Sequence, residues 1–268
     1  MSVEVKKEGE FQYYESDDKG DPIILLHGLM GTLSNFEALI EYFRGRHKVV
    51  FPLLPLFEIP LRKLSLATLV EHVAGFIEYK GYNKVYMLGN SLGGHLALLY
   101  AQQYPDKLRG LILTGSSGLY EKSLGNTFPK RGDYEFVKRK TQEVFYNPED
   151  ASKELIDSVY AIVNDLRKAM SVVALAKSAI RHNMEDDLLQ IKVNTLIIWG
   201  IEDTVTPLWV GEKFHKLLEN SELVRIAKTG HAPMLERPDV FNAKLEDFIL
   251  RVDNGTFPDD KHPTESFD

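Results

Sequence analysis

A serine held between two glycines is the residue of this chain best placed to do chemistry. Ser91 stands in Gly89-Asn90-Ser91-Leu92-Gly93, after an apolar run over residues 85–88 and before a helix-forming stretch. A serine at the tip of a tight strand-to-helix turn takes a φ above zero, and glycines two residues away on either side prevent a clash between the arms of the turn. Its hydroxyl is then exposed beside a helix N-terminus, which favours negative charge. The spacing is typical of a nucleophilic serine, although average glycine and serine usage produces it by chance in about one chain in ten of this length.

A serine hydroxyl is a weak nucleophile at neutral pH, so it needs a base, and the base needs an orienting carboxylate. His231 and Asp203 each follow an apolar run that predicts a strand, with Glu202 as the rival carboxylate. The order Ser91, Asp203, His231 is one known order of such triads and differs from those of trypsin and subtilisin. A lone loop histidine is more often a surface residue, and an aspartate after a strand often forms a turn or a helix cap. The triad hypothesis therefore depends on the agreement of order and strand context.

Hydrolysis by a serine nucleophile also needs N–H donors for the oxyanion that develops on the substrate. One donor is the residue after the nucleophile, and the other comes from the loop after an early strand. These residues are Leu92 and, in the glycine-bearing loop His27-Gly28-Leu29-Met30-Gly31, Leu29. Met30 is the alternative if the loop is shifted by one residue. We expect His27 to support this loop rather than to transfer protons.

The elements that must position these residues alternate between strand and helix. Apolar runs predict strands at residues 10–16, 22–26, 49–51, 85–88, 111–113, 195–199 and 222–227. Helical spacing and capping residues predict helices over residues 34–43, 65–80, 92–103 and 207–218, and from about residue 238 onward. Continuous apolar strands that alternate with helices are typical of a mostly parallel α/β sheet flanked by helices. The loops that carry Ser91, Asp203 and His231 then lie at the same end of this sheet.

The alternation stops between residues 117 and 189, where the apolar spacing is only helical. Leu155, Val159 and Ile162 mark one amphipathic helix, and Met170, Val173 and Ile180 mark another. We therefore predict an α/β core over residues 1–116 and 190–254, with residues 117–189 inserted as a helical cap over the carboxyl end of the sheet. The polar residues 255–268 are predicted to form a poorly ordered tail.

Composition limits the class of function. The chain has 268 residues, 44% hydrophobic and 26% charged, as in globular proteins. A net charge of −7 argues against a nucleic-acid partner, because phosphates are neutralised by clustered lysine and arginine. The absence of cysteine excludes thiolate chemistry, and no histidine–carboxylate spacing predicts a metal or cofactor site. The charged N-terminus and the short apolar runs predict a cytoplasmic protein with a small-molecule substrate and no membrane partner, either monomer or dimer.

The chain as a whole resembles the α/β-hydrolase superfamily. The resemblance rests on His27-Gly28, Gly89-Asn90-Ser91-Leu92-Gly93-Gly94, Trp199-Gly200-x-x-Asp203 and Gly230-His231, with Glu236-Arg237-Pro238 after them. It implies the α/β-hydrolase fold with the triad named above, but it does not fix the substrate, because the fold hosts many chemistries. Within the superfamily the chain is most similar to the meta-cleavage-product hydrolases, which break a carbon–carbon bond. That similarity runs through Ser34-Asn35-Phe36, Asn90, Val205-Thr206-Pro207-Leu208 and Asn220-Ser221-Glu222-Leu223.

The similarity to meta-cleavage-product hydrolases implies that Asn35 and Asn90 belong to a polar pocket. The chain also departs from that family. Leu29-Met30-Gly31 replaces a Gly-Pro-Gly type of loop, Ala232 stands where a tryptophan is usual, and residues 51–55 lack an expected Asp and Gly. Val159 stands near the expected place of an arginine that grips the substrate carboxylate. Without that cation, the departures count against an acidic dienoate substrate.

We therefore predict a serine hydrolase that cleaves the carboxylic ester of a small or medium-sized, largely apolar substrate through an acyl-enzyme. The first alternative is hydrolysis of a carbon–carbon bond in a vinylogous diketone by the same triad. The second is a ligand-binding receptor of this fold with little turnover. Candidate substrate-lining residues, beside Asn35, Asn90 and Met30, are Leu119, Phe128, Phe145, Met170 and Met234. Methionines and aromatic residues in a cap are, however, more often its core.

Overall fold

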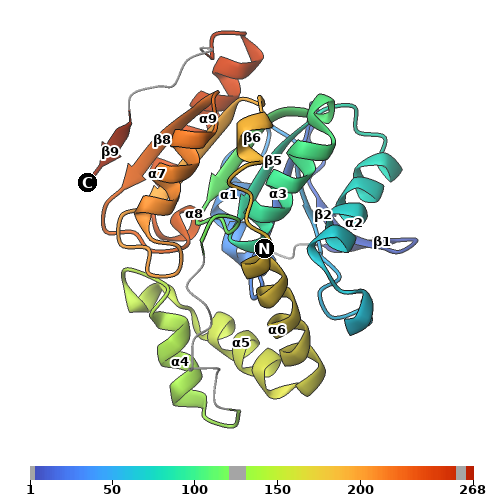
Figure 1. The fold of residues 1–268 in the computed structure, drawn as a ribbon, viewed down its shortest axis with the longest axis vertical. Coiled ribbons are helices and arrows are strands. Elements are labelled where there is room, and N and C mark those ends of the chain that lie inside the picture. The colour runs from blue at the N-terminus through green and yellow to red at the C-terminus, as the bar shows by residue number, and fades with distance from the viewer. Residues whose placement is uncertain (1–3, 121–130, 258–263) are drawn as a thin grey trace.

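A computed structural model gives the fold of residues 4–120, 131–257 and 264–268 (Figure 1). In these residues nine strands form one sheet, in the order β1-β2-β4-β3-β5-β6-β7-β8-β9. The strands are β1 (Lys6–Glu8), β2 (Phe11–Glu15), β3 (Ile23–Leu26), β4 (Val49–Pro52), β5 (Val85–Asn90), β6 (Leu108–Thr114), β7 (Thr195–Gly200), β8 (Ser221–Ile226) and β9 (Glu265–Phe267). β2 pairs antiparallel with β1 and β4, and every pair from β4 to β9 is parallel. The prediction of a mostly parallel α/β sheet is confirmed.

Helices cover both faces of the sheet. They are α1 (Glu37–Phe43), α2 (Leu66–Tyr79), α3 (Leu92–Gln103), α4 (Tyr134–Gln142), α5 (Lys153–Asn164), α6 (Leu166–Arg181), α7 (Leu208–Leu217), α8 (Pro233–Glu236) and α9 (Pro238–Asp253), with short 3-10 helices η1 (Leu33–Phe36), η2 (Leu61–Lys63), η3 (Pro105–Lys107), η4 (Pro148–Asp150) and η5 (Leu188–Gln190). Along β3, Ile24 and Leu26 pack with α2, α3 and α7, whereas Ile23 and Leu25 pack with α1 and α9. None of the described helices has the length and apolar character needed to cross a membrane.

Helices α4, α5 and α6 follow β6 and precede β7, and they form a separate layer at one end of the sheet (Figure 1). The side chains of Ser152 and Asp165 cap α5 and α6 by accepting backbone N–H bonds. Helix α4 is absent from the predicted elements because few of its residues are apolar. Only Val137 and Thr141 of its nine residues are buried.

The end of the chain differs from the expectation of a poorly ordered tail. Strand β9 lies within residues 255–268 and pairs parallel with β8. The N–H of Ala227 donates to the carbonyl of Phe267 at 2.7 Å, and the Lys244 ammonium lies 2.5 Å from Glu265 and over the Phe267 ring. Pairing with an open strand edge orders a segment whose polar composition favours disorder. The tail prediction is therefore wrong for these three residues.

Glu15, on β2, is a partly buried carboxylate with several polar partners, none of them Ser91, Asp203 or His231. It accepts hydrogen bonds from Tyr82 at 2.5 Å and from Lys80 at 2.9 Å, and Lys48 lies 3.5 Å away. Burial alone raises the pKa of this carboxyl, but the hydrogen bonds and the lysine charges outweigh burial and lower the pKa from 4.5 to about 2. A depressed carboxyl pKa stabilises the fold above about pH 4.5, and this stabilisation is lost as the pH falls towards 2.

We expect Glu15→Gln to lower the free energy of unfolding by about 2 kcal/mol at neutral pH and by well under 1 kcal/mol near pH 2.5. Urea unfolding at the two pH values measures the difference. Glu219→Gln is the control, because Glu219 is an exposed carboxylate paired with Lys192 and should contribute little at either pH. An equal loss at both pH values in Glu15→Gln would contradict the depressed pKa.

Candidate active site

Ser91 occupies the turn between β5 and α3. Its backbone has φ 56° and ψ −120°, which is strained for a residue that carries a side chain. A Cβ on Gly89 would lie 2.3 Å from the carbonyl oxygen of Gly93, and a Cβ on Gly93 would lie 2.0 Å from that of Leu26. Glycine at position 89 therefore lets β5 and α3 approach closely across the turn, and glycine at position 93 lets α3 pack against the end of β3.

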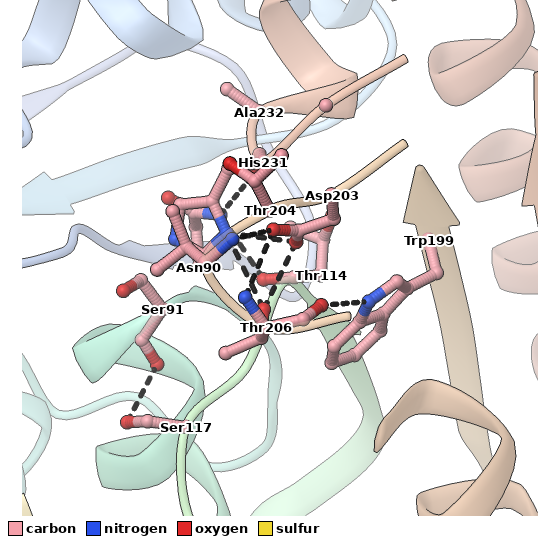
Figure 2. Close-up of polar contacts among 12 residues, drawn as sticks. Asn90, Ser91, Thr114, Ser117, Trp199, Asp203, Thr204, Thr206, His231 and Ala232 are labelled. Atoms are coloured by element: carbon pink, nitrogen blue, oxygen red, sulfur yellow. Dashed lines mark hydrogen bonds and ion pairs between the residues drawn. The ribbon is translucent and has the colours of Figure 1, made fainter. Parts of the chain in front are cut away.

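His231 and Asp203 are joined by a hydrogen bond of 2.8 Å between Nδ1 and Oδ2 (Figure 2). They follow the neighbouring parallel strands β8 and β7, so their loops meet at the edge of the sheet where Ser91 lies. Asp203 is 5% exposed, and its Oδ1 accepts the N–H groups of Val205 and Thr206 at 2.8 and 2.9 Å. The Thr206 hydroxyl donates to Oδ2 at 2.9 Å. Because the carboxylate is an acceptor throughout, Nδ1 of His231 carries the proton and Nε2 is the basic nitrogen.

Ser91 and His231 line one cavity of about 310 Å³, and Figure 2 shows Ser91 beside the Asp203–His231 pair. Most of the cavity wall is apolar, with Leu29, Met30, Val137, Val144, Phe145, Leu155, Val159, Val172, Val205 and Ala232. Lys140 is the one other ionisable side chain among the described lining residues. Across the described ranges, no three His, Asp or Glu side chains are grouped so that they could hold a metal ion. The wall thus suits an apolar substrate.

The loop after β3 runs beside Ser91. A Cβ on Gly28 would lie 3.1 Å from Cβ of Ser91, and Leu29 lines the cavity. His27 Nδ1 donates to the Gly28 carbonyl at 2.7 Å, and burial lowers the pKa of His27, so the ring stays neutral. In a trans peptide the C=O and N–H point in opposite directions, so this bond turns the Leu29 N–H away from His27. The N–H of Leu92 is the first of α3 and has no acceptor within the helix.

The candidate asparagines lie in the cavity wall with Met30 and Phe145. Asn35 Oδ1 accepts the N–H of Thr32 at 3.1 Å, so its carbonyl oxygen is used within its own loop. Asn90 Nδ2 donates at 3.1 Å to the carbonyl oxygens of Thr114 and His231. Asn90 therefore ties the His231 loop to β6 (Figure 2).

Of the other candidate lining residues, Leu119, Met170 and Met234 lie elsewhere. Leu119 packs in the core between α3 and the cap, and Met234 is fully buried in the core on the opposite face of the sheet. Met170 is 48% exposed on the outer side of α6. The structure does not bring these three side chains into the cavity wall, because residue type does not give the direction of a side chain. Phe128 lies outside the described residues.

Sequence reasoning missed two residues that support His231 and Asp203. Thr206 holds the Asp203 carboxylate through both its N–H and its hydroxyl, and the spacing Asp-x-x-Thr, common in turns, is a signal for it. Glu236 accepts the N–H groups of Gly230 at 2.8 Å and Ala232 at 3.1 Å, on either side of His231. It also accepts the N–H of Tyr146 at 2.8 Å and so joins this loop to the cap. No sequence pattern singles out Glu236 for this role.

Burial raises the pKa of Glu236, while its backbone hydrogen bonds oppose the shift. Without the carboxylate, the three N–H groups named above lose their acceptor. We expect Glu236→Ala to lower the free energy of unfolding by about 3 kcal/mol and to reduce kcat, because the His231 loop loses its support. Urea unfolding and ester kinetics measure both effects. Glu219→Ala, an equal truncation on the surface, should change neither, and an unchanged stability in Glu236→Ala would contradict the supporting role.

Residues 21–238 match the family model of the alpha/beta hydrolase fold. A solved alpha/beta hydrolase enzyme from the metagenome of lagoon sediments of Mar Chica, Morocco, is 41% identical, with a TM-score of 0.77, and covers 93% of this chain and 99% of its own. A 2-hydroxy-6-oxo-2,4-heptadienoate hydrolase of Pseudomonas putida is 26% identical over 87% of this chain and 91% of that protein. A pimeloyl-[acyl-carrier protein] methyl ester esterase of Neisseria meningitidis is 33% identical over 61% of this chain and 70% of that protein. The chain therefore belongs to the α/β-hydrolase fold family, and it is a hydrolase of that superfamily.

Proposed function

We propose that this protein is a serine hydrolase that cleaves a carboxylic ester through an acyl-enzyme on Ser91. The observation that carries the proposal is the hydrogen-bonded Asp203–His231 pair near a serine in a strained turn, with Ser91 and His231 lining one cavity. Strain is kept in a backbone only where the surrounding structure enforces it, and such positions cluster at functional sites.

In the proposed reaction, Oγ of Ser91 attacks the ester carbonyl carbon while Nε2 of His231 takes the hydroxyl proton. Asp203 stabilises the imidazolium, and the N–H groups of Leu29 and Leu92 stabilise the oxyanion. As the tetrahedral intermediate collapses, His231 gives the proton to the leaving alcohol and the acyl group stays on Ser91. Water then attacks the acyl-enzyme with His231 as base, which releases the acid and restores the serine.

The size and the lining of the cavity support the proposal of a small or medium-sized apolar substrate. Its volume of about 310 Å³ is at the lower end of ordinary ligand pockets, and its wall is mostly aliphatic. Phe145, Val159 and Val172 come from the cap, so cap side chains would contact the substrate directly.

A second candidate function is carbon–carbon bond hydrolysis of an acidic dienoate, and Lys140 is the observation that favours it. The Lys140 ammonium lies 2.5 Å from Glu143, and the two side chains are 35% and 49% exposed. An ion pair this exposed is weak, so Lys140 can exchange its partner for a substrate carboxylate at the cavity. The relative from Pseudomonas putida is named for a substrate of this kind.

A substrate panel separates the candidates. Purified protein is assayed on p-nitrophenyl esters of short and medium chain length and on a ring-fission dienoate. We expect kcat/KM to be at least about 100-fold higher for the best ester, because an apolar wall gains little from the charged dienoate. Preference for the dienoate would support the second candidate. Binding without turnover of either substrate would support a receptor and would overturn both enzymatic proposals.

Lys140 is tested with the same panel. If it binds a carboxylate, Lys140→Met should lower kcat/KM for an acidic substrate about tenfold relative to a neutral ester, mainly through KM. Lys138→Met, on the same helix but outside the cavity wall, is the matched control. An unchanged ratio in Lys140→Met would remove this lysine from substrate recognition.

A further inference from the structure

A larger hollow lies on the outer side of α6, separate from the catalytic cavity. It has a volume of about 820 Å³ and lies between α6 and the short helix η2, and we name it the α6 groove. Its apolar wall includes Leu61, Leu64, Leu166, Met170 and Val173. Leu166 is 58% exposed and Met170 is 48% exposed, so these side chains have little apolar cover. The two hollows share no described lining residue.

The charged residues of the α6 groove are all basic. Arg131, Lys177 and Arg181 line it, and its described lining includes no aspartate or glutamate. Helix α6 itself has four basic residues and no acidic one, although the chain has 39 acidic against 32 basic residues. Within the described ranges, neither Lys177 nor Arg181 forms an ion pair, and the Arg131 guanidinium donates to the carbonyl of Asn164 at 3.0 Å. The groove therefore carries positive charge that the described part of the chain does not neutralise.

The apolar and basic residues follow one another along the helix. Met170, Val173, Lys177 and Arg181 are three or four residues apart, which places them on one face of α6. At a rise of about 1.5 Å per residue, the face from Met170 to Arg181 is about 16 Å long. Its first half is apolar and its second half is cationic. This arrangement matches a ligand that has an extended apolar chain and one anionic end.

We propose that the α6 groove binds a single-chain anionic amphiphile, with an unbranched alkyl chain and a carboxylate or phosphate headgroup. The chain lies against Leu166, Met170 and Val173, where it removes exposed apolar surface from water. The headgroup lies at Lys177 and Arg181, neither of which forms an ion pair within the described part of the chain. A hollow bounded by both α6 and η2 suits one chain from solution, whereas a membrane surface needs a protruding apolar face.

Calorimetric titration of the full chain with dodecanoate, kept monomeric, tests the proposal. We expect one molecule to bind in the groove, about tenfold tighter than dodecan-1-ol, and to bind more weakly as NaCl rises from about 0.05 to about 0.5 M. The charge-reversal variant Lys177→Glu/Arg181→Glu and the variant Met170→Glu should each weaken dodecanoate binding at least about tenfold. Lys153→Glu, on the exposed surface of α5, is the matched charge control and should leave binding unchanged.

A third variant distinguishes the groove from the catalytic cavity without relying on turnover. Val159→Phe partly fills the catalytic cavity, and we expect it to leave dodecanoate binding unchanged. Loss of binding in Val159→Phe, with normal binding in Lys177→Glu/Arg181→Glu, would place the ligand in the catalytic cavity and overturn the proposal. Equal binding of dodecanoate and dodecan-1-ol would also overturn it. Sedimentation with phosphatidylglycerol vesicles, without binding of monomeric dodecanoate, would assign the basic face to a membrane surface instead.

Discussion

Ser91→Ala is expected to reduce kcat for the best p-nitrophenyl ester by at least about 10⁴-fold. The methyl side chain cannot attack a carbonyl, so no acyl-enzyme forms, and only the oxyanion donors and substrate binding remain to accelerate hydrolysis by water. KM should change much less than kcat, because alanine removes one oxygen from a cavity whose wall is mainly apolar. Steady-state kinetics on highly purified protein measures both constants.

Ser158→Ala is the matched control. The Ser158 hydroxyl donates to the backbone of α5 at 2.8 Å, so this variant removes a hydroxyl with a hydrogen bond outside the catalytic cavity. It should keep nearly the full rate. A Ser91→Ala variant within about tenfold of the parent rate would mean that another group is the nucleophile.

Asp203→Asn is expected to lower kcat by about 10³–10⁴-fold without unfolding the protein. The amide oxygen of asparagine can keep the N–H bonds from Val205 and Thr206 that Oδ1 of Asp203 now accepts. Its NH₂ group would then face Nδ1 of His231. Because NH₂ is a donor, His231 would have to carry its proton on Nε2, which is the nitrogen that must accept the proton of Ser91. The imidazolium would also lose its neighbouring negative charge.

Glu202→Gln separates this role from that of the neighbouring carboxylate. Glu202 Oε2 accepts the N–H of Thr229 at 3.0 Å, and the carbonyl of glutamine can keep that bond. The rate should therefore change less than about threefold. A large loss in Glu202→Gln together with a near-normal rate in Asp203→Asn would exchange the two assignments.

The parts of the fold that could be predicted from sequence are those in which one local rule decides the outcome. The apolar runs of β3, β5 and β7 have few alternatives to burial in a parallel sheet. The turn at Ser91 was predictable because Gly89 and Gly93 are the residues that close packing at this turn requires. Helix α4 and strand β9 were not predictable, because α4 has few apolar residues and β9 is ordered by pairing with β8.

The candidate site also has some residues that the sequence could predict and others that it could not. The side chains of Asp203 and His231 could be placed together because each follows a strand, and parallel strands bring their following loops to one edge. The cavity wall could not be predicted from residue type, and the structure places Leu119 and Met234 in the core instead. Glu236 stands in a stretch that carries the family resemblance, but its role was missed because it acts through backbone N–H groups, which leave no pattern in the sequence.

The reactivity of the Ser91 hydroxyl is tested most directly by covalent trapping with an alkyl fluorophosphonate, followed by mass spectrometry of the intact protein and its peptides. The result we predict is one adduct per chain on the peptide that contains Ser91, with loss of esterase activity in proportion to labelling. Labelling should be absent in Ser91→Ala and much slower in Asp203→Asn. An adduct on any other residue, or full ester turnover by a protein that is labelled at Ser91, would contradict the proposed mechanism.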